Sequence, residues 1–367
     1  MIGYLCATPY HILAAAAMAS DIFAAEPSTL IVLDHFSVDD DLLSEIRKTG
    51  VFSEVLLFHS NNKSLLNRVK RLYNTFVPHP LMRALGKRTD FSQFICFALD
   101  FINIAYLQKL YARAGVDCSF AFAEDGIGSY INETLYQPNR LTQILLRLTG
   151  RTQYLEQVKT LYLYKPEYAV KNTGFTLKKI QQSEKTKAAL RDFAAAVWPF
   201  SDAAGFQNAV LYFQQPRELE NDDGDLQPEQ AAVQAAADTL HCPLLVKLHP
   251  RAFAQSEWAD FPLLKSRVPF EAILLQTDFV PKLLLTDYST AVFSPYLLDG
   301  ISDGAYDTIF LSRILHKPSP WLTELNASIA SFCARINAQF GREVMHLPES
   351  EAAYQQTLLS LQDKESI

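Results

Sequence analysis

The sequence lacks the features that mark secreted and membrane-spanning chains. Its five cysteines (Cys6, Cys96, Cys118, Cys242 and Cys333) are scattered and show no C-x-x-C spacing, so we expect reduced thiols and not a disulfide framework. No apolar run is long enough to span a bilayer. The first residues, MIGYLCATPYHILAAAAMA, carry no positive segment of the kind that opens a signal peptide. These absences predict a cytoplasmic protein.

Positive charge is also scarce. The 33 lysine and arginine residues are outnumbered by 40 aspartate and glutamate residues, which gives a formal net charge of −7. This balance argues against nucleic acid as a partner. The 367 residues, 49% of them hydrophobic, are enough for two packed domains with sizeable cores.

One segment lacks acidic residues altogether. Between Glu54 and Asp90 the chain has only basic charges, interleaved with apolar residues, at Lys63, Arg68, Lys70, Arg71, Arg83, Lys87 and Arg88. Two interpretations stay open: a solvated pair of helices, or a surface that contacts a polyanionic glycan or the anionic lipid of the inner membrane. On the second interpretation we expect the segment on one surface of the N-terminal half, near the mouth of a cleft.

Apolar runs alternate with helical patterns, which predicts an α/β chain with parallel sheets. In the first half we expect strands at 2–7, 29–33, 55–58, 118–123 and 161–164, and helices at 9–19 and 92–114. Residues 171–191 show no strand pattern and predict a connecting helix and linker. The second half predicts strands at 209–213, 244–248, 272–275, 282–285 and 308–311, with helices at 228–240 and 291–298.

The pattern therefore predicts two consecutive doubly wound, Rossmann-like domains that face each other across a cleft. We place them at residues 1–190 and 205–345, followed by a C-terminal helix at 346–367. In such folds, ligands bind at the carboxyl ends of the strands. Residues that directly follow predicted strands are therefore the candidates for function.

Two acidic residues and a glycine, Glu124-Asp125-Gly126, follow the strand at 118–123. A carboxylate at this edge can take a proton from a hydroxyl nucleophile. Short acidic turns and helix caps are common, however, so the segment by itself favours a structural role.

A second group, Lys247-Leu248-His249-Pro250-Arg251, follows the strand at 244–248. His249 can donate a hydrogen bond or a proton to a leaving phosphate, and Pro250 stiffens the turn that holds it. Lys247 and Arg251 add positive charge. A lone histidine after a strand is more often structural, and this one gains weight only from its companions.

Two more groups lie further along the chain. The hydroxyls of Ser289 and Thr290, within T-D-Y-S-T, stand at a strand–helix junction that favours an anion, and helix capping there is compatible with phosphate binding. Glu271, within P-F-E, can accept hydrogen bonds from ribose hydroxyls, although by itself it indicates little.

The order T-P-Y, E-D-G, K-L-H-P-R, P-F-E and D-Y-S-T resembles the bacterial GT-B sialyltransferases that act on lipooligosaccharides or build capsular polysialic acid. Those enzymes share a D/E-D/E-G motif, an H-P motif and a serine/threonine pair. The resemblance spans residues 8–290. Each motif is short, and their shared order carries the specificity.

The resemblance implies a role for each matching residue. Asp125, beside Gly126, would be the general base, with Glu124 as the fallback. His249 would stabilise or protonate the departing CMP, while Ser289 and Thr290 hold its phosphate and Glu271 holds the ribose. Thr8 and Pro9 would face the donor sugar. The implied partners are a CMP-sugar donor and a glycan acceptor, lipid-linked in some members.

No cofactor and no metal are expected. CMP carries one phosphate, so side chains can neutralise it, and the D-x-D at Asp223-Gly224-Asp225 lies in a polar stretch that predicts a turn. Three alternatives stay open: a CDP-glycerol or CDP-ribitol phosphotransferase, a transferase of another CMP-sugar such as Kdo, and a non-catalytic glycan-binding subunit of a capsule assembly complex.

Overall fold

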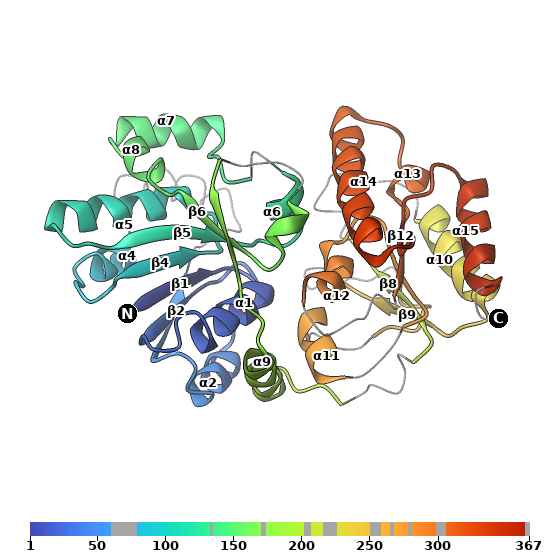
Figure 1. Ribbon diagram of the computed structural model, residues 1–367, viewed down its shortest axis with the longest axis horizontal. Helices are drawn as coiled ribbons and strands as arrows, with labels where there is room; N and C mark the ends of the chain where they lie inside the picture. The colour runs from blue at the N-terminus through green and yellow to red at the C-terminus, as the bar shows by residue number, and fades with distance from the viewer. Residues whose placement is uncertain are drawn as a thin grey trace. The chain divides into compact units, whose positions relative to one another are not determined.

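The computed structural model describes residues 1–59, 79–132, 135–169, 174–201, 207–215, 226–249, 258–264, 268–277, 281–298 and 306–363. The chain divides into two compact units, unit 1 (Met1–Trp198) and unit 2 (Pro199–Ile367) (Figure 1). Within the described ranges, no helix is long and apolar enough to cross a membrane.

Unit 1 is built on a parallel sheet with the strand order β3-β2-β1-β4-β5-β6-β7. Its strands are β1 (Ile2–Cys6), β2 (Ser28–Leu33), β3 (Glu54–Phe58), β4 (Gln93–Cys96), β5 (Ser119–Ala123), β6 (Thr160–Leu163) and β7 (Thr176–Lys179). The chain runs outward from β1 to β3 and then returns to add β4 on the other side of β1. Doubly wound sheets bind ligands at such a switch point.

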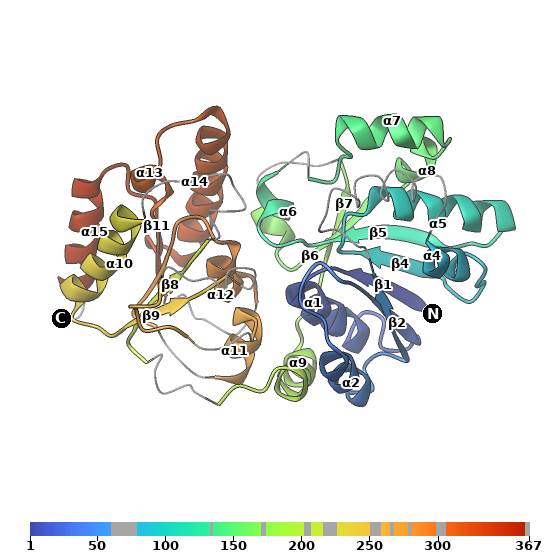
Figure 2. The ribbon, with the colours of Figure 1, turned by 180° about the vertical axis from the view of Figure 1, so that it is seen from behind.

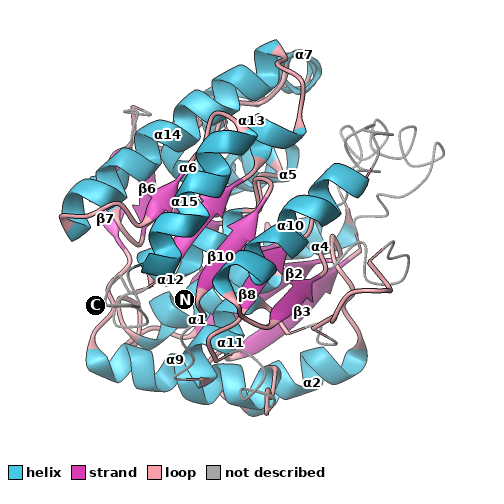
Figure 3. Ribbon diagram, turned by 90° about the vertical axis from the view of Figure 1, so that its right-hand side faces the viewer, coloured by secondary structure: helices cyan, strands magenta, loops and turns pink. Residues whose placement is uncertain are grey.

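The helices of unit 1 form two groups on opposite faces of this sheet (Figures 1 and 2). One group comprises α1 (Pro9–Ser20), α2 (Asp40–Lys48) and α9 (Glu184–Val197), and α9 packs against the other two (Figure 3). In the other group, α5 (Phe101–Ala114) contacts α4 (Pro80–Leu85), α7 (Arg140–Leu148) and α8 (Thr152–Leu155). Two short helices, α6 (Gly128–Ile131) and η1 (Pro166–Tyr168), follow β5 and β6.

Unit 2 has a second parallel sheet, in the order β12-β11-β10-β8-β9. Its strands are β8 (Val210–Phe213), β9 (Leu244–Lys247), β10 (Leu283–Thr286), β11 (Asp307–Phe310) and β12 (Met345–His346). Its helices are α10 (Gln227–Leu240), α11 (Phe270–Gln276), η4 (Thr290–Phe293), α12 (Ser294–Leu297), α13 (Ser312–Leu315), α14 (Pro320–Phe340) and α15 (Glu351–Asp363).

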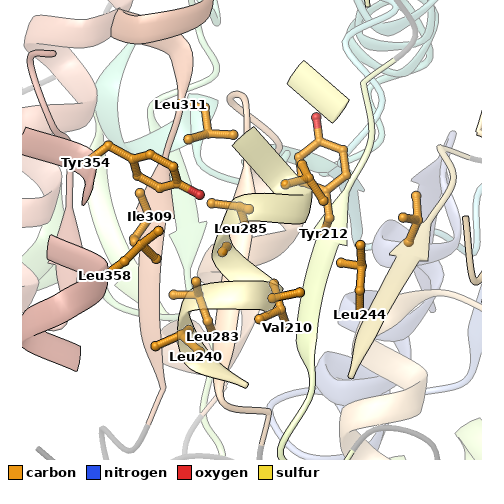
Figure 4. Close-up of a cluster of buried hydrophobic side chains, with 14 of the residues drawn as sticks. Val210, Tyr212, Leu240, Leu244, Leu283, Leu285, Ile309, Leu311, Tyr354 and Leu358 are labelled. Carbon is orange, nitrogen blue, oxygen red and sulfur yellow. The ribbon is translucent and has the colours of Figure 1, made fainter. Parts of the chain in front are cut away.

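The core of unit 2 shows why its strands are almost continuously apolar. Leu283, Leu285 and Ile309 from the sheet are fully buried against α10 and α15, which contribute Leu240 and Leu358 (Figure 4). A strand covered on both faces has no solvent side on which to place polar residues, so the alternating pattern of a half-exposed strand disappears.

The predicted fold class is confirmed: both units are α/β with parallel, doubly wound sheets. The predicted long helix at 92–114 is wrong in its first part, because Gln93–Cys96 form β4 and the helix begins at Phe101. Phe94 and Ile95 are fully buried in the sheet, and Asp100 caps the helix by accepting a hydrogen bond from the Asn103 backbone N–H at 3.3 Å.

Two other predictions of secondary structure are also wrong. The predicted strand at 272–275 lies inside helix α11, because an apolar run of four residues cannot distinguish a buried helix from a buried strand. The stretch 171–191 contains a strand, β7, which pairs in parallel with β6. This edge strand is largely exposed, so it carries no apolar run that the sequence could reveal.

Candidate active site

The candidate site in unit 1 forms where the residues after β1 meet those after β5. Thr8 caps helix α1 by accepting a hydrogen bond from the His11 backbone N–H at 3.2 Å, and Pro9 occupies the first turn of the helix. Both residues, predicted to face the donor sugar, are partly buried. The cap fixes the start of α1, which delivers Tyr10 and His11 toward the acidic turn.

Glu124 is fully buried beside β5 and is held from three directions. The Tyr10 and Tyr130 hydroxyls donate to its carboxyl oxygens, and the Tyr164 backbone N–H donates at 2.9 Å. Burial raises the pKa of Glu124 to about 7, while the three hydrogen bonds act in the opposite direction. Glu124 therefore ties α1, α6 and β6 together inside the unit.

Asp125, the next residue, has a different environment. Its side chain is 36% exposed, and its Oδ1 lies 2.6 Å from His11 Nε2. The other ring nitrogen, His11 Nδ1, accepts a hydrogen bond from the Ala7 backbone N–H at 3.1 Å. In the neutral ring the proton is therefore on Nε2, which donates it to Asp125.

The backbone around Asp125 is also fixed. Gly126 adopts φ of +69°, a left-handed conformation that glycine takes without the strain of a side chain. The Asp125 N–H donates to Ser129 Oγ at 2.7 Å, and that hydroxyl lies 2.6 Å from the Tyr136 hydroxyl. A carboxylate with one oxygen held by His11 and the side chain partly open to solvent can accept a proton from a bound hydroxyl group.

In unit 2, His249 lies two residues after the end of β9. Its backbone N–H donates to Gln214 Oε1, on the residue after β8, at 3.2 Å, which ties the two strand ends together. Lys247 is buried, and its Nζ donates to the Val268 carbonyl at 3.0 Å. Burial lowers the pKa of Lys247 to about 8, although the nearby Glu271 acts to raise it.

Glu271 and the hydroxyl pair lie near the start of short helices. Glu271 Oε1 accepts a hydrogen bond from Ser294 Oγ at 2.7 Å, and burial raises the pKa of Glu271. Ser289 is buried and caps η4, whereas Thr290 is exposed. The Ser289 N–H donates to Thr286 Oγ1 at 2.9 Å, so β10 positions the pair.

Two histidines of these sites were not singled out by the sequence. The signal that could have identified His11 is an imidazole in an otherwise apolar helix after the first strand. His316, after α13, lies with its Nε2 2.6 Å from Asp287 Oδ2, two residues before Ser289. Its signal was weaker, because nothing in the sequence pairs it with the motif at Asp287.

Some predicted features fall outside the described residues: Pro250, Arg251, the D-x-D at 223–225 and residues 60–78 of the acid-free segment. Of the basic residues that are described there, Arg83 and Lys87 are exposed. Arg88 instead forms ion pairs with Glu54 at 2.6 Å and Asp90 at 2.8 Å. Within the described ranges, no cluster of three or more His, Cys, Asp or Glu side chains could hold a metal ion.

At the level of sequence, no protein-family model and no curated protein matches this chain. Solved structures do match. An α/β-galactoside α-2,3-sialyltransferase from Photobacterium phosphoreum has a TM-score of 0.53 at 11% identity, covering 94% of this chain and 98% of the other. The spinosyn rhamnosyltransferase SpnG has a TM-score of 0.54 at 12% identity, covering 100% and 91%.

A third similar structure is the UDP-GlcNAc 2-epimerase from Methanocaldococcus jannaschii, with a TM-score of 0.55 at 10% identity, covering 99% of this chain and 91% of the other. The chain therefore has a glycosyltransferase-like GT-B fold. Because an epimerase shares it, the fold alone does not define the reaction.

Proposed function

We propose that the protein is an inverting, metal-independent sialyltransferase. It would transfer sialic acid from CMP-sialic acid to a hydroxyl group of a lipooligosaccharide or capsular glycan. The observation that carries this proposal is the Asp125 carboxylate, with Oδ1 held by His11 and the side chain partly exposed at the carboxyl end of β5. The ordered motifs and the presence of a sialyltransferase among the proteins of this fold support the choice of donor.

Asp125 suits the role of general base better than Glu124. A base must reach the hydroxyl proton of a bound acceptor, and Glu124 is fully buried with both carboxyl oxygens already bonded. Asp125 has one oxygen oriented by His11 and a side chain that solvent reaches. We therefore assign the proton transfer to Asp125 and a structural role to Glu124.

The proposed step is a single displacement. The acceptor oxygen attacks the anomeric carbon of the donor sugar while its proton passes to Asp125. The bond between that carbon and the phosphate oxygen breaks, and CMP leaves with the electron pair. Attack opposite to the leaving group inverts the anomeric configuration. The anomeric carbon of a sialic acid is fully substituted, so the transition state resembles an oxocarbenium ion and negative charge develops on the phosphate.

In this proposal, residues of unit 2 would receive this charge. His249 would donate a proton or hydrogen bond to the departing phosphate, and Ser289 and Thr290 would bind its oxygens. Glu271 would accept hydrogen bonds from the ribose through the carboxyl oxygen that Ser294 does not hold. Lys247, bonded to the Val268 carbonyl, would contribute by its charge and by fixing the segment that leads to Glu271.

A panel of donors tests the proposal. The purified protein is incubated with CMP-sialic acid, CMP-Kdo, CDP-glycerol and CDP-ribitol, with and without lipooligosaccharide or capsular oligosaccharide acceptors. We expect acceptor-dependent release of CMP from CMP-sialic acid. Turnover of only a CDP-polyol would identify a phosphotransferase, and turnover of only CMP-Kdo would change the donor. A rise in melting temperature with CMP but no turnover would favour the non-catalytic subunit.

A further inference from the structure

Helix α7 presents a stripe of apolar side chains to solvent. Leu141, Ile144 and Leu148 are 64%, 52% and 70% exposed. Their spacing of three and four residues places them on one side of the helix. Leu145 and Leu146 are buried and anchor the helix against the unit. Of the five large hydrophobic side chains found exposed in the described residues, three belong to this helix, and such clustering marks an interaction surface.

The apolar stripe of α7 has a basic edge. Arg140 and Arg147 are exposed and lie one helical turn from Ile144 in either direction, beside the stripe. No acidic residue occurs between positions 135 and 155. Apolar side chains next to arginines on one exposed face are typical of helices that lie in a membrane interface.

The rest of the helical layer strengthens this charge pattern. The helices α4, α5 and α8, which share a face of the sheet with α7, contain no acidic residue, although the whole chain has a net charge of −7. On the opposite face, α2 and α9 carry several acidic residues. Among these helices of unit 1, the acidic residues therefore lie on the face of the sheet opposite the apolar stripe; the two groups of helices can be followed in Figures 1 and 2.

From this arrangement we propose that α7 docks the protein on an anionic lipid surface. Leu141, Ile144 and Leu148 would enter the boundary between headgroups and acyl chains, while Arg140 and Arg147 bind lipid phosphates. A second copy of the chain fits the stripe less well, because a two-fold contact through α7 would bring the arginines of both copies together. The proposal concerns binding and holds whatever sugar the enzyme transfers.

Vesicle co-sedimentation of the full chain tests this surface. We expect binding to vesicles of phosphatidylcholine with phosphatidylglycerol, little binding to phosphatidylcholine alone, and weaker binding as salt rises. The double variant Arg140→Glu/Arg147→Glu should lower the partition coefficient by at least about tenfold, since each arginine contributes roughly a fivefold effect near an anionic surface. The variant Leu141→Ser/Ile144→Ser/Leu148→Ser should lower it by at least about tenfold as well.

Matched variants elsewhere provide the controls. Lys185→Glu/Arg191→Glu reverses two exposed charges on α9, and Leu359→Ser removes an exposed leucine on α15. Both should bind vesicles like the wild type. The proposal is overturned if the α7 variants also bind like the wild type, or if the leucine and isoleucine changes dissolve a dimer in solution without affecting vesicle binding. Vesicle binding without any CMP release would leave this proposal standing and remove the proposed function instead.

Discussion

His11 Nε2 lies 2.6 Å from Asp125 Oδ1, although 114 residues separate them in the sequence. The preceding residues of each pair also meet, because the Tyr10 hydroxyl donates to Glu124. Two consecutive residues at the start of α1 thus hold two consecutive residues after β5. His11 is further fixed by the Ala7 N–H and by stacking on Phe97, with 5.6 Å between ring centroids.

This geometry predicts that His11 positions the base and does not relay protons. Its Nδ1 is occupied by the Ala7 N–H, so the ring cannot take a second proton without losing that bond. His11→Ala should lower kcat by up to roughly 100-fold, because a displaced carboxylate is poorly placed to accept the proton of the acceptor hydroxyl, and should leave CMP affinity unchanged. His11→Gln, whose amide can still donate to Asp125, should recover much of the loss. A relay through His11 would instead leave both variants equally inactive and shift the pH profile.

Asp125→Asn should separate chemistry from binding. The amide keeps the size of the side chain but cannot accept the acceptor's proton, so kcat should fall by about 10²–10⁴-fold while CMP affinity is unaltered. Glu124→Gln is the matched control, with less than about tenfold loss, because an amide can still bond to the two tyrosines. Steady-state kinetics and calorimetry with CMP measure both quantities. Full turnover in Asp125→Asn together with loss in Glu124→Gln would move the base to Glu124.

The class of fold could be predicted because buried parallel strands are nearly continuous apolar runs that alternate with helical patterns. The prediction failed where that relation breaks down, at the exposed edge strand β7 and the short buried helix α11. The candidate residues were found by their position after strands, and Asp125 is a clear example. The partnership with His11 could not be found in this way, since it depends on β4 lying between β1 and β5 in the sheet.

The stability of the protein should depend on pH through Glu124. Burial raises its pKa from the usual 4.5 to about 7, so between these values the folded chain holds a proton that the unfolded chain has released. The proton on Glu124 adds on the order of 3 kcal/mol to the free energy of unfolding below about pH 4.5. This contribution is lost as the pH rises through 7. Urea unfolding of wild type and Glu124→Gln at pH 5 and pH 8 measures it. Glu124→Gln should lack this decline, and an equal decline in both proteins would contradict the assignment.

On the proposed mechanism, turnover should not require a divalent metal, because CMP-sialic acid carries a single phosphate, which His249, Ser289 and Thr290 would bind. Addition of EDTA should therefore leave the rate of CMP release within about twofold of the untreated enzyme. Loss of activity with EDTA, restored by Mg²⁺ or Mn²⁺, would contradict the proposed mechanism and would direct attention to the acidic stretch at 223–225.

The proposed phosphate-binding groups of unit 2 should show the opposite signature to Asp125. His249→Ala should weaken CMP binding and lower kcat together, because in the proposed mechanism the imidazole would contact the phosphate both before and during its departure. Ser289→Ala should act in the same direction but less strongly, by about 1.5–3 kcal/mol for one hydrogen bond to a charged group. Thr286→Val tests positioning. It removes the hydroxyl on β10 that accepts the Ser289 N–H and should lower CMP affinity less than Ser289→Ala does. Calorimetry with CMP and turnover with CMP-sialic acid are measured on the same preparations.

If His249→Ala lowered kcat alone, the histidine would act only on the leaving group. If it changed neither quantity, His249 would have no part in the donor site.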